Sequence, residues 1–217
     1  MKNILVTGCN GQLGNEMQLL ATGYPEFNYF FTDVKELDIT DENAVKSFVK
    51  TNGIDCVVNC AAYTAVDKAE ADEAFCNILN HIAPGYLAKA VHEQGGCMIQ
   101  VSTDYVFDGT THIPYREEEP TCPATVYGRT KLAGEEAVMR NCPESVIIRT
   151  AWLYSTFGNN FVKTMLRLGR EKESLGADEG RHPQRRCGGR HADGRGGGSA
   201  HAPRLCLCRR RARRLLL

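Results

Sequence analysis

A short apolar strand that runs directly into three evenly spaced glycines constrains the fold of this chain more than any other feature. Residues 2–7 have the composition of a buried β-strand, and Gly8, Gly11 and Gly14 follow before a helical pattern begins. Such glycines let the backbone turn tightly beside an anion and let the helix pack against the strand. The pattern predicts a dinucleotide-binding turn spaced G-x-x-G-x-x-G. A plain strand-to-helix turn is the competing interpretation.

An acidic residue follows the second apolar run. Asp33 lies 19 residues beyond Gly14, where a carboxylate can accept both hydroxyls of an adenosine ribose and would repel a 2′-phosphate. This position favours NAD over NADP without excluding NADP. An aspartate that opens an ordinary turn is the alternative. We expect Asp38 and Ile39 beside the adenine.

Two hydroxyls and a tyrosine–lysine pair indicate proton chemistry. Ser102 and Thr103 end an apolar run, and Tyr127 and Lys131 lie one turn apart on a predicted helix. A cation near a phenol favours the phenolate, so we expect Lys131 to lower the pKa of Tyr127 from its ordinary value of about 10. A phenol tuned in this way can protonate a carbonyl. Because side chains alternate along a strand, only one of the two hydroxyls can point into the site.

Apolar runs alternate with helical patterns along the first 176 residues. Strands are predicted at 3–7, 27–32, 55–60, 97–102 and 145–149, and helices at 12–21, 41–52, 71–92, 125–140 and 160–172. Thr40 and Asp41 open one helix and Gly53 closes it. The alternation predicts an α/β fold with a doubly wound parallel sheet of the Rossmann type, in a single domain over residues 1–176.

Four segments make the chain similar to a known family. They are Val6 to Gly14, Val58 to Glu70, Val101 to Gly109 and Tyr127 to Gly134. With them, residues 1 to about 176 resemble the extended short-chain dehydrogenase/reductase family, and most of all its nucleotide-sugar reductases. The resemblance implies that NADH or NADPH reduces the C4 ketone of dTDP-4-dehydro-L-rhamnose to dTDP-L-rhamnose. It also implies a small C-terminal substrate domain, which is largely missing here.

The resemblance assigns roles to individual residues. Tyr127 would protonate the ketone while hydride arrives from the nicotinamide, Lys131 would also hold the nicotinamide ribose, and Thr103 would orient the substrate carbonyl. Cofactor-binding residues would be Gly8, Asn10, Gly11, Gln12, Leu13, Gly14, Asp33, Asp38, Ile39, Ala61, Ala62, Tyr63, Asn80, Tyr127 and Lys131. Substrate-binding residues would be Thr64, Val66, Thr103, Asp104, Tyr105 and Trp152. No metal site is predicted.

Several alternatives stay open. Tyr105 and Trp152 can also be read as core aromatic residues, and the charged stretch 67–73 as a solvated helix face. Dehydratases of the family place an Asp-Glu pair after the catalytic threonine, whereas Thr103 is followed by Asp104 and Tyr105. Nucleotide-sugar epimerases and dehydratases remain alternative functions. A non-catalytic binding role, like that of the methionine adenosyltransferase regulatory subunit, is another.

The last 41 residues, 177–217, differ in composition from the rest. They contain eleven arginines, no lysine, and no Ile, Val, Phe, Tyr, Trp, Met, Thr or Asn, so we predict a disordered segment that supplies neither strand nor core. Its net charge is +8 and that of the remainder −8. A basic tail that binds nucleic acid or an anionic surface is a weaker interpretation than a frameshift near Gly176, and so is a metal site. If the polypeptide ends in this tail, we expect an unpaired sheet edge and weak turnover.

The chain shows no export signal or membrane span, because polar residues interrupt its apolar start within a few positions. Seven cysteines lie in residues 1–176, without the spacing of a disulfide framework, and are interpreted as reduced thiols. We therefore expect a cytoplasmic protein that binds neither nucleic acid nor membrane. The resemblance implies that it binds a nucleotide sugar. The family resemblance also allows a homodimer.

Overall fold

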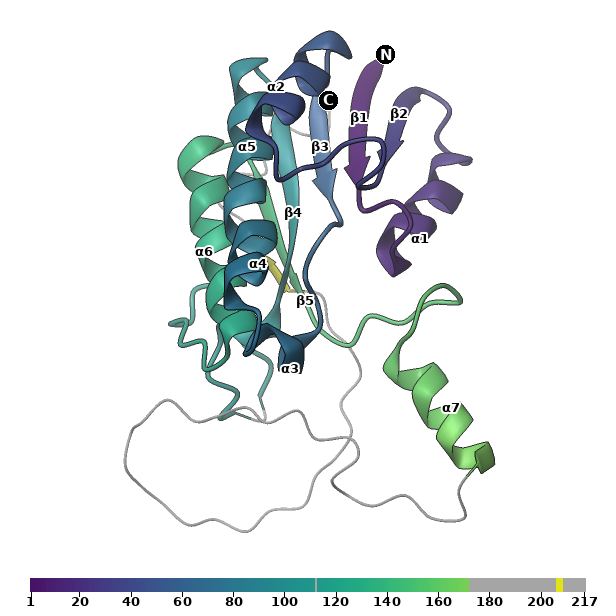
Figure 1. Ribbon diagram of the computed structural model, residues 1–217, viewed down its shortest axis with the longest axis vertical. Helices are drawn as coiled ribbons and strands as arrows, with labels where there is room; N and C mark the ends of the chain where they lie inside the picture. The colour runs from purple at the N-terminus through teal and green to yellow at the C-terminus, as the bar shows by residue number, and fades with distance from the viewer. Residues whose placement is uncertain (112, 172–205, 209–217) are drawn as a thin grey trace.

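The structure is a computed structural model that describes residues 1–111, 113–171 and 206–208. Its centre is one sheet with the strand order β2-β1-β3-β4-β5-β6 (Figure 1). The strands are β1 (Lys2–Thr7), β2 (Phe27–Thr32), β3 (Cys56–Asn59), β4 (Cys97–Thr103), β5 (Val146–Thr150) and β6 (Cys206–Cys208). The first five are parallel, and β6 runs antiparallel to β5. The predicted Rossmann-type parallel sheet is confirmed.

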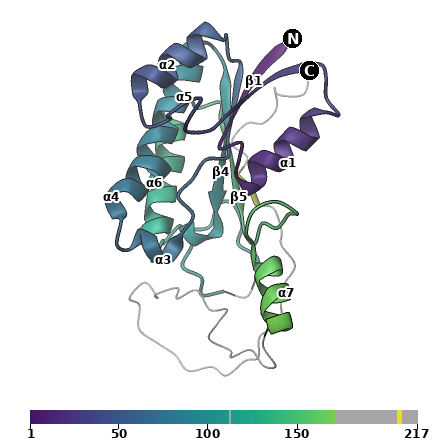
Figure 2. The same cartoon turned by 45° about the vertical axis from the view of Figure 1, so that its right-hand side comes forward.

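Helices flank both faces of this sheet. They are α1 (Gln12–Ala21), α2 (Glu42–Thr51), α3 (Val66–Ala69), α4 (Glu73–Asn77), the π-helical turn η1 (Ile78–Ile82), α5 (Ala83–Glu93), the 3₁₀ turn η2 (Asp104–Val106), α6 (Val126–Asn141) and α7 (Phe161–Glu171). Figure 2 shows α2, α5 and α6 on one side of the sheet, and α1 and α7 on the other. Because β1 to β5 are parallel, their carboxyl ends all lie at the same edge of the sheet, which is where ligands of such folds bind.

The predicted elements agree with the structure in position, and one helix is more complex than expected. Asp41 caps α2 by accepting hydrogen bonds from two backbone amides of its first turn, as the sequence predicted. The helix expected at 71–92 is instead three pieces, α4, η1 and α5. Single π-turns inside helices are frequent at functional sites. Here the π-turn contains the buried Asn80.

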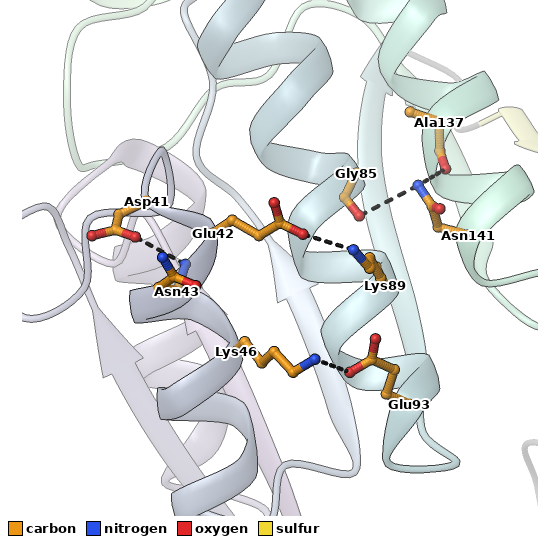
Figure 3. A network of polar contacts seen from close by, with 9 residues as sticks. All are labelled: Asp41, Glu42, Asn43, Lys46, Gly85, Lys89, Glu93, Ala137 and Asn141. Carbon is orange, nitrogen blue, oxygen red and sulfur yellow. Dashed lines mark hydrogen bonds and ion pairs between the residues drawn. The ribbon is translucent and has the colours of Figure 1, made fainter.

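The main core lies between the sheet and the layer of α2, α5 and α6. Leu5, Val57, Leu87 and Met98 are fully buried there. Polar contacts also link the helices on the outer side of this layer, as Figure 3 shows. Lys89 pairs with Glu42 at 2.8 Å and Lys46 with Glu93 at 3.0 Å, so two ion pairs join α2 and α5. In the same view Asn141 of α6 donates to the Gly85 carbonyl of α5 at 3.4 Å. Exposed ion pairs of this kind add little stability, so apolar burial holds the layer.

The C-terminal segment departs from its prediction at three residues. Cys206–Cys208 forms β6, with Leu207 in register with Ile148 of β5. The expectations that residues 177–217 supply no strand and that the sheet keeps an unpaired edge are therefore wrong here. The outer edge of β5 offers unpaired backbone groups, and a short apolar triplet can satisfy them whatever its neighbours are. The rest of the predicted disordered segment lies outside the described residues.

Two further expectations concern membranes and thiols. Within the described residues, no helix is long and apolar enough to cross a bilayer. Six of the seven cysteines in residues 1–176 are free, at positions 9, 56, 60, 76, 97 and 142. Cys122 is disulfide-bonded, which corrects the expectation of a reduced thiol at that position.

Candidate active site

The glycine turn has the close backbone packing that the sequence predicted. Gly8 has a φ of +63°, which an L side chain rarely adopts, and a Cβ there would lie 2.8 Å from Ala61. A Cβ on Gly14 would lie 2.3 Å from the carbonyl oxygen of Gly8. Helix α1 begins after Gly11, and no side chain caps it. Its first amides are therefore available to an anion, as pyrophosphate binding requires.

Asp33 lies beside this turn. Its carboxylate accepts hydrogen bonds from the backbone amides of Asn10, at 3.1 Å, and Val34, at 2.8 Å. The carboxylate thus fixes the glycine turn to the end of β2, and its contact with a ribose stays a prediction. Asp38 instead accepts the hydroxyl and amide of Thr40, which lower its pKa, and Ile39 is buried in the main core. Contact of Asp38 and Ile39 with an adenine stays a prediction.

A buried polar ladder crosses the sheet behind the turn. The Thr7 hydroxyl donates to Asn59 Oδ1 at 2.6 Å, and Asn59 Nδ2 donates to Gln100 Oε1 at 2.8 Å. Asn59 Oδ1 also accepts the amide of Ala61 at 3.2 Å, so the ladder fixes the chain as it leaves β3. All three side chains are almost fully buried. Because their polar groups are paired, the ladder rigidifies the ends of β1 and β3 against the middle of β4.

Asn80 positions the segment that follows β3. Its side chain accepts the Tyr63 amide at 2.8 Å and donates to the Tyr63 carbonyl at 3.1 Å. Asn80 is 1% exposed, and α6 comes so near that a Cβ on Gly134 would lie 2.1 Å from the Asn80 carbonyl oxygen. Asn80, predicted to bind the cofactor, thus fixes the backbone of the predicted cofactor segment at Tyr63 while itself lying inside the protein.

The threonine and tyrosine predicted to be catalytic lie where β4 approaches α6. The Thr103 hydroxyl lies near the Tyr127 phenol, whose pKa it lowers, and donates to Asp104 Oδ1 at 3.1 Å. The rings of Tyr105 and Tyr127 are edge to face, with centroids 5.5 Å apart. A Cβ on Gly128 would lie 2.3 Å from the Tyr105 carbonyl oxygen, so glycine permits this approach. Thr103 is thus the hydroxyl that faces the phenol.

Lys131 lies deeper than the sequence suggested. It is 3% exposed, and its ammonium donates to the Val101 carbonyl at 2.7 Å. Burial lowers the pKa of Lys131 to about 8, and the nearby Glu135 carboxylate partly offsets the effect. Burial raises the pKa of Tyr127 to about 12, while the Thr103 hydroxyl opposes the rise. The expected lowering of the Tyr127 pKa by Lys131 is therefore wrong for the protein without ligand, because desolvation outweighs any nearby charge.

A buried ion pair behind Lys131 was not predicted. Arg149 of β5 donates to both oxygens of Glu135, the shortest distance being 2.6 Å, and the Ser102 hydroxyl donates to the same carboxylate at 2.5 Å. Ser102 thus belongs to a structural network and Thr103 to the site, as alternation along the strand implies. The spacing of Tyr127, Lys131 and Glu135 by four residues was the available signal, since it places all three on one face of α6.

The residues predicted to bind only the sugar are more exposed than Thr103 and Lys131. Thr64 is exposed, and Val66 and Asp104 are partly buried, with burial raising the pKa of Asp104. Trp152 is 55% exposed, has a φ of 55°, and contacts Phe161 of α7 edge to face at 4.9 Å. The core alternative for Trp152 is therefore wrong. The charged residues of the stretch 67–73 are exposed, as the solvated-face interpretation predicts, and Glu70 also accepts the first amide of α6 at 2.9 Å.

Among the described residues, no cluster of three or more His, Cys, Asp or Glu side chains is placed to hold a metal ion.

The fold and the grouping of Thr103, Tyr127 and Lys131 beside a glycine turn define a dinucleotide-binding domain of the short-chain dehydrogenase/reductase type. Residues 1–183 match the family described as RmlD substrate binding domain. The chain belongs to this family.

Curated relatives and solved structures agree with the family. The chain is 45% identical over 177 residues to the dTDP-4-dehydrorhamnose reductase of Salmonella typhimurium, covering 80% of this chain and 58% of that reductase. A dTDP-4-dehydrorhamnose reductase from Clostridium acetobutylicum has a TM-score of 0.77 at 46% identity, over 80% of this chain and 61% of the other. The Bacillus anthracis enzyme, in complex with NADP, has a TM-score of 0.77 at 38% identity, over 81% and 63%. The chain thus spans less than two thirds of these relatives.

Proposed function

We propose that this chain carries the cofactor-binding and proton-donating part of an NAD(P)H-dependent reductase. Its substrate would be the C4 ketone of dTDP-4-dehydro-L-rhamnose, and the product dTDP-L-rhamnose. The observation that carries the proposal is the convergence of Thr103, Tyr127 and Lys131 at the sheet edge where the glycine turn also lies. The names of the relatives supply the substrate.

The dinucleotide fits the residues of the turn. Gly8 and Gly14 leave no room for a Cβ, and no side chain caps the start of α1. Asp33, whose carboxylate contacts the turn at the Asn10 amide, would accept the ribose hydroxyls. When bound, NADH or NADPH would supply the hydride. Asp33 favours NADH, whereas the Bacillus anthracis relative is in complex with NADP, so both cofactors belong in the test.

The protein groups would handle the proton. Reduction needs a phenol that carries its proton, and a pKa near 12 keeps Tyr127 protonated at every pH at which the protein would work. Thr103, which lies near this phenol and lowers its pKa, would orient the ketone toward it. The phenol proton would pass to the ketone oxygen, and the tyrosinate left behind would be stabilised by the Thr103 hydroxyl and by charge on Lys131.

We further propose that the 217-residue polypeptide binds cofactor well but reduces the sugar weakly. The predicted sugar residues Thr64 and Trp152 are exposed, and relatives have additional length that this chain does not match. The homodimer, the lack of a nucleic-acid partner and the cytoplasmic location stay predictions.

The test has two independent readouts. Fluorescence titration with NADH and NADPH measures cofactor affinity, and loss of reduced-cofactor absorbance with the 4-keto sugar measures turnover. We expect saturable cofactor binding and slow turnover that Tyr127→Phe abolishes. A folded protein that binds neither cofactor would contradict the proposed function. Fast saturable reduction of the sugar would contradict only the proposal of weak turnover.

A further inference from the structure

Two free cysteines face each other at the end of the sheet opposite the candidate active site. Cys56 is the first residue of β3 and Cys97 the first of β4, and they are register partners in the parallel pair. Figure 1 shows the starts of these strands at the end of the molecule near the N-terminus, whereas the site lies at their other ends. Neither cysteine takes part in the proposed reaction.

The geometry of the pair suits a covalent bond. Adjacent strands lie about 4.8 Å apart, within the Cα separation of roughly 4.4–6.8 Å that a disulfide needs. Register partners point to the same face of the sheet, and the next pair, Val57 and Met98, is buried on the opposite face. Each thiol shifts the pKa of the other, as expected of neighbours on one face of the sheet. Both cysteines are partly exposed, so a small oxidant can reach them.

The charges around the pair activate one sulfur. The neighbouring Cys56 thiol lowers the pKa of Cys97, which burial raises, and Cys97 raises the pKa of Cys56, so Cys97 is the one that ionises. Lys2 also lowers the pKa of Cys97, while Asp55 and Glu144 raise it. A third thiol, Cys142, is fully buried in the main core and points its sulfur to the Gly96 carbonyl at 3.7 Å. Cys142 is thus the less suitable partner for Cys97.

We propose that Cys56 and Cys97 form a redox-active dithiol that a hydroperoxide converts to a cross-strand disulfide. The Cys97 thiolate attacks a peroxide oxygen, the O–O bond breaks, and a sulfenic acid and hydroxide form. The Cys56 sulfur then attacks the Cys97 sulfur, the S–S bond forms, and the sulfenic oxygen leaves as water with the Cys56 proton. Each peroxide is reduced by two electrons and the dithiol is oxidised by two. A thiol reductant reverses the change.

Peptide mapping of the full chain tests the proposal. Trypsin places Cys56 and Cys60 on peptide 51–68 and Cys97 alone on peptide 90–116, so a Cys60→Ser background leaves one thiol on each. After hydrogen peroxide treatment, we expect these two peptides joined and dithiothreitol to separate them. Adding Cys56→Ser or Cys97→Ser should reduce the joined species at least about tenfold, whereas adding Cys76→Ser should not.

Alkylation of the native protein supplies a second measurement that does not depend on oxidation. Under limiting iodoacetamide near neutral pH, Cys97 should be labelled before Cys60, whose pKa burial raises to about 12. Cys56→Ser should slow labelling of Cys97 less than Cys56→Ala, because a hydroxyl can still donate to the thiolate. A disulfide from Cys97 to Cys142 instead, or two thiols that survive peroxide in the folded protein, would overturn the proposal.

Discussion

The two halves of the candidate site differ in how firmly the chain holds them. Thr103, Tyr127 and Lys131 belong to β4 and α6, and the last of these residues is 3% exposed. Trp152 and Thr64 follow the ends of strands and are exposed. Preorganised groups on rigid elements are what proton transfer requires, whereas exposed side chains have few contacts to fix them. The comparison indicates that the residues predicted for chemistry are held more firmly than those predicted for sugar recognition.

The largest expected effect is on turnover, and it follows from removing the Tyr127 hydroxyl from the rigid half of the site. Tyr127→Phe removes the hydroxyl and keeps the ring that packs edge to face on Tyr105. We expect turnover to fall about 10³-fold, since a general acid contributes roughly 10²–10⁴-fold, with little change in cofactor affinity. Initial rates and cofactor titration measure the two effects.

Tyr29→Phe, on β2 at the far side of the sheet, is the matched control and should leave turnover unchanged. Substantial turnover by Tyr127→Phe would show that another group protonates the ketone.

The next largest effect concerns the buried ion pair of Glu135 and Arg149, which packs behind the rigid half of the site. Glu135→Gln leaves the Arg149 guanidinium, 8% exposed, without its anionic partner. Breaking one side of a buried ion pair costs about 3–5 kcal/mol, so the free energy of unfolding in urea should fall by that amount. The exposed pair of Arg167 and Glu171 on α7 is the control, because Glu171→Gln should cost less than about 0.5 kcal/mol. Equal losses for the two variants would contradict the distinction between the regions.

A third prediction uses the charge of Lys131. Its lowered pKa of about 8 means that the ammonium loses its proton as pH rises through that value, while Tyr127 stays protonated to about 12. We expect cofactor affinity to fall up to about tenfold above pH 8, because a charged donor to the ribose is lost. Lys131→Met should bind weakly at every pH and show no alkaline decline. A decline that persists in this variant would assign it to another group.

Stability should change with pH in the opposite direction. Unfolded Lys131 keeps its proton up to its ordinary pKa of 10.5, so between about pH 8 and 10.5 the unfolded state binds more protons. The contribution of this residue to the free energy of unfolding therefore rises with pH in that window. Lys131→Met removes the rise, which urea titrations at the two ends of the window can measure.

Sequence patterns predicted the rigid half well where the signals are local. The glycine turn, the Asp41 cap and the bounds of β2 come from short-range periodicity and turn chemistry, and the structure has them where expected. The depth of Lys131 and the pairing of Glu135 with Arg149 depend on contacts between distant segments, which no local pattern contains. The predicted effect of Lys131 on Tyr127 failed for this reason, since desolvation is a tertiary property.

The smallest expected effect concerns the exposed half. Trp152→Ala removes a ring that is 55% exposed and touches Phe161 only edge to face, so the free energy of unfolding should change by less than about 1 kcal/mol. Trp152→Gly should be slightly more stable than Trp152→Ala, by about 0.5–1 kcal/mol, because the φ of 55° suits glycine. Both variants should bind cofactor as the parent does. A loss of several kcal/mol for Trp152→Ala, or a loss of cofactor binding, would show that the exposed half supports the rigid one, and the distinction between the two would no longer hold.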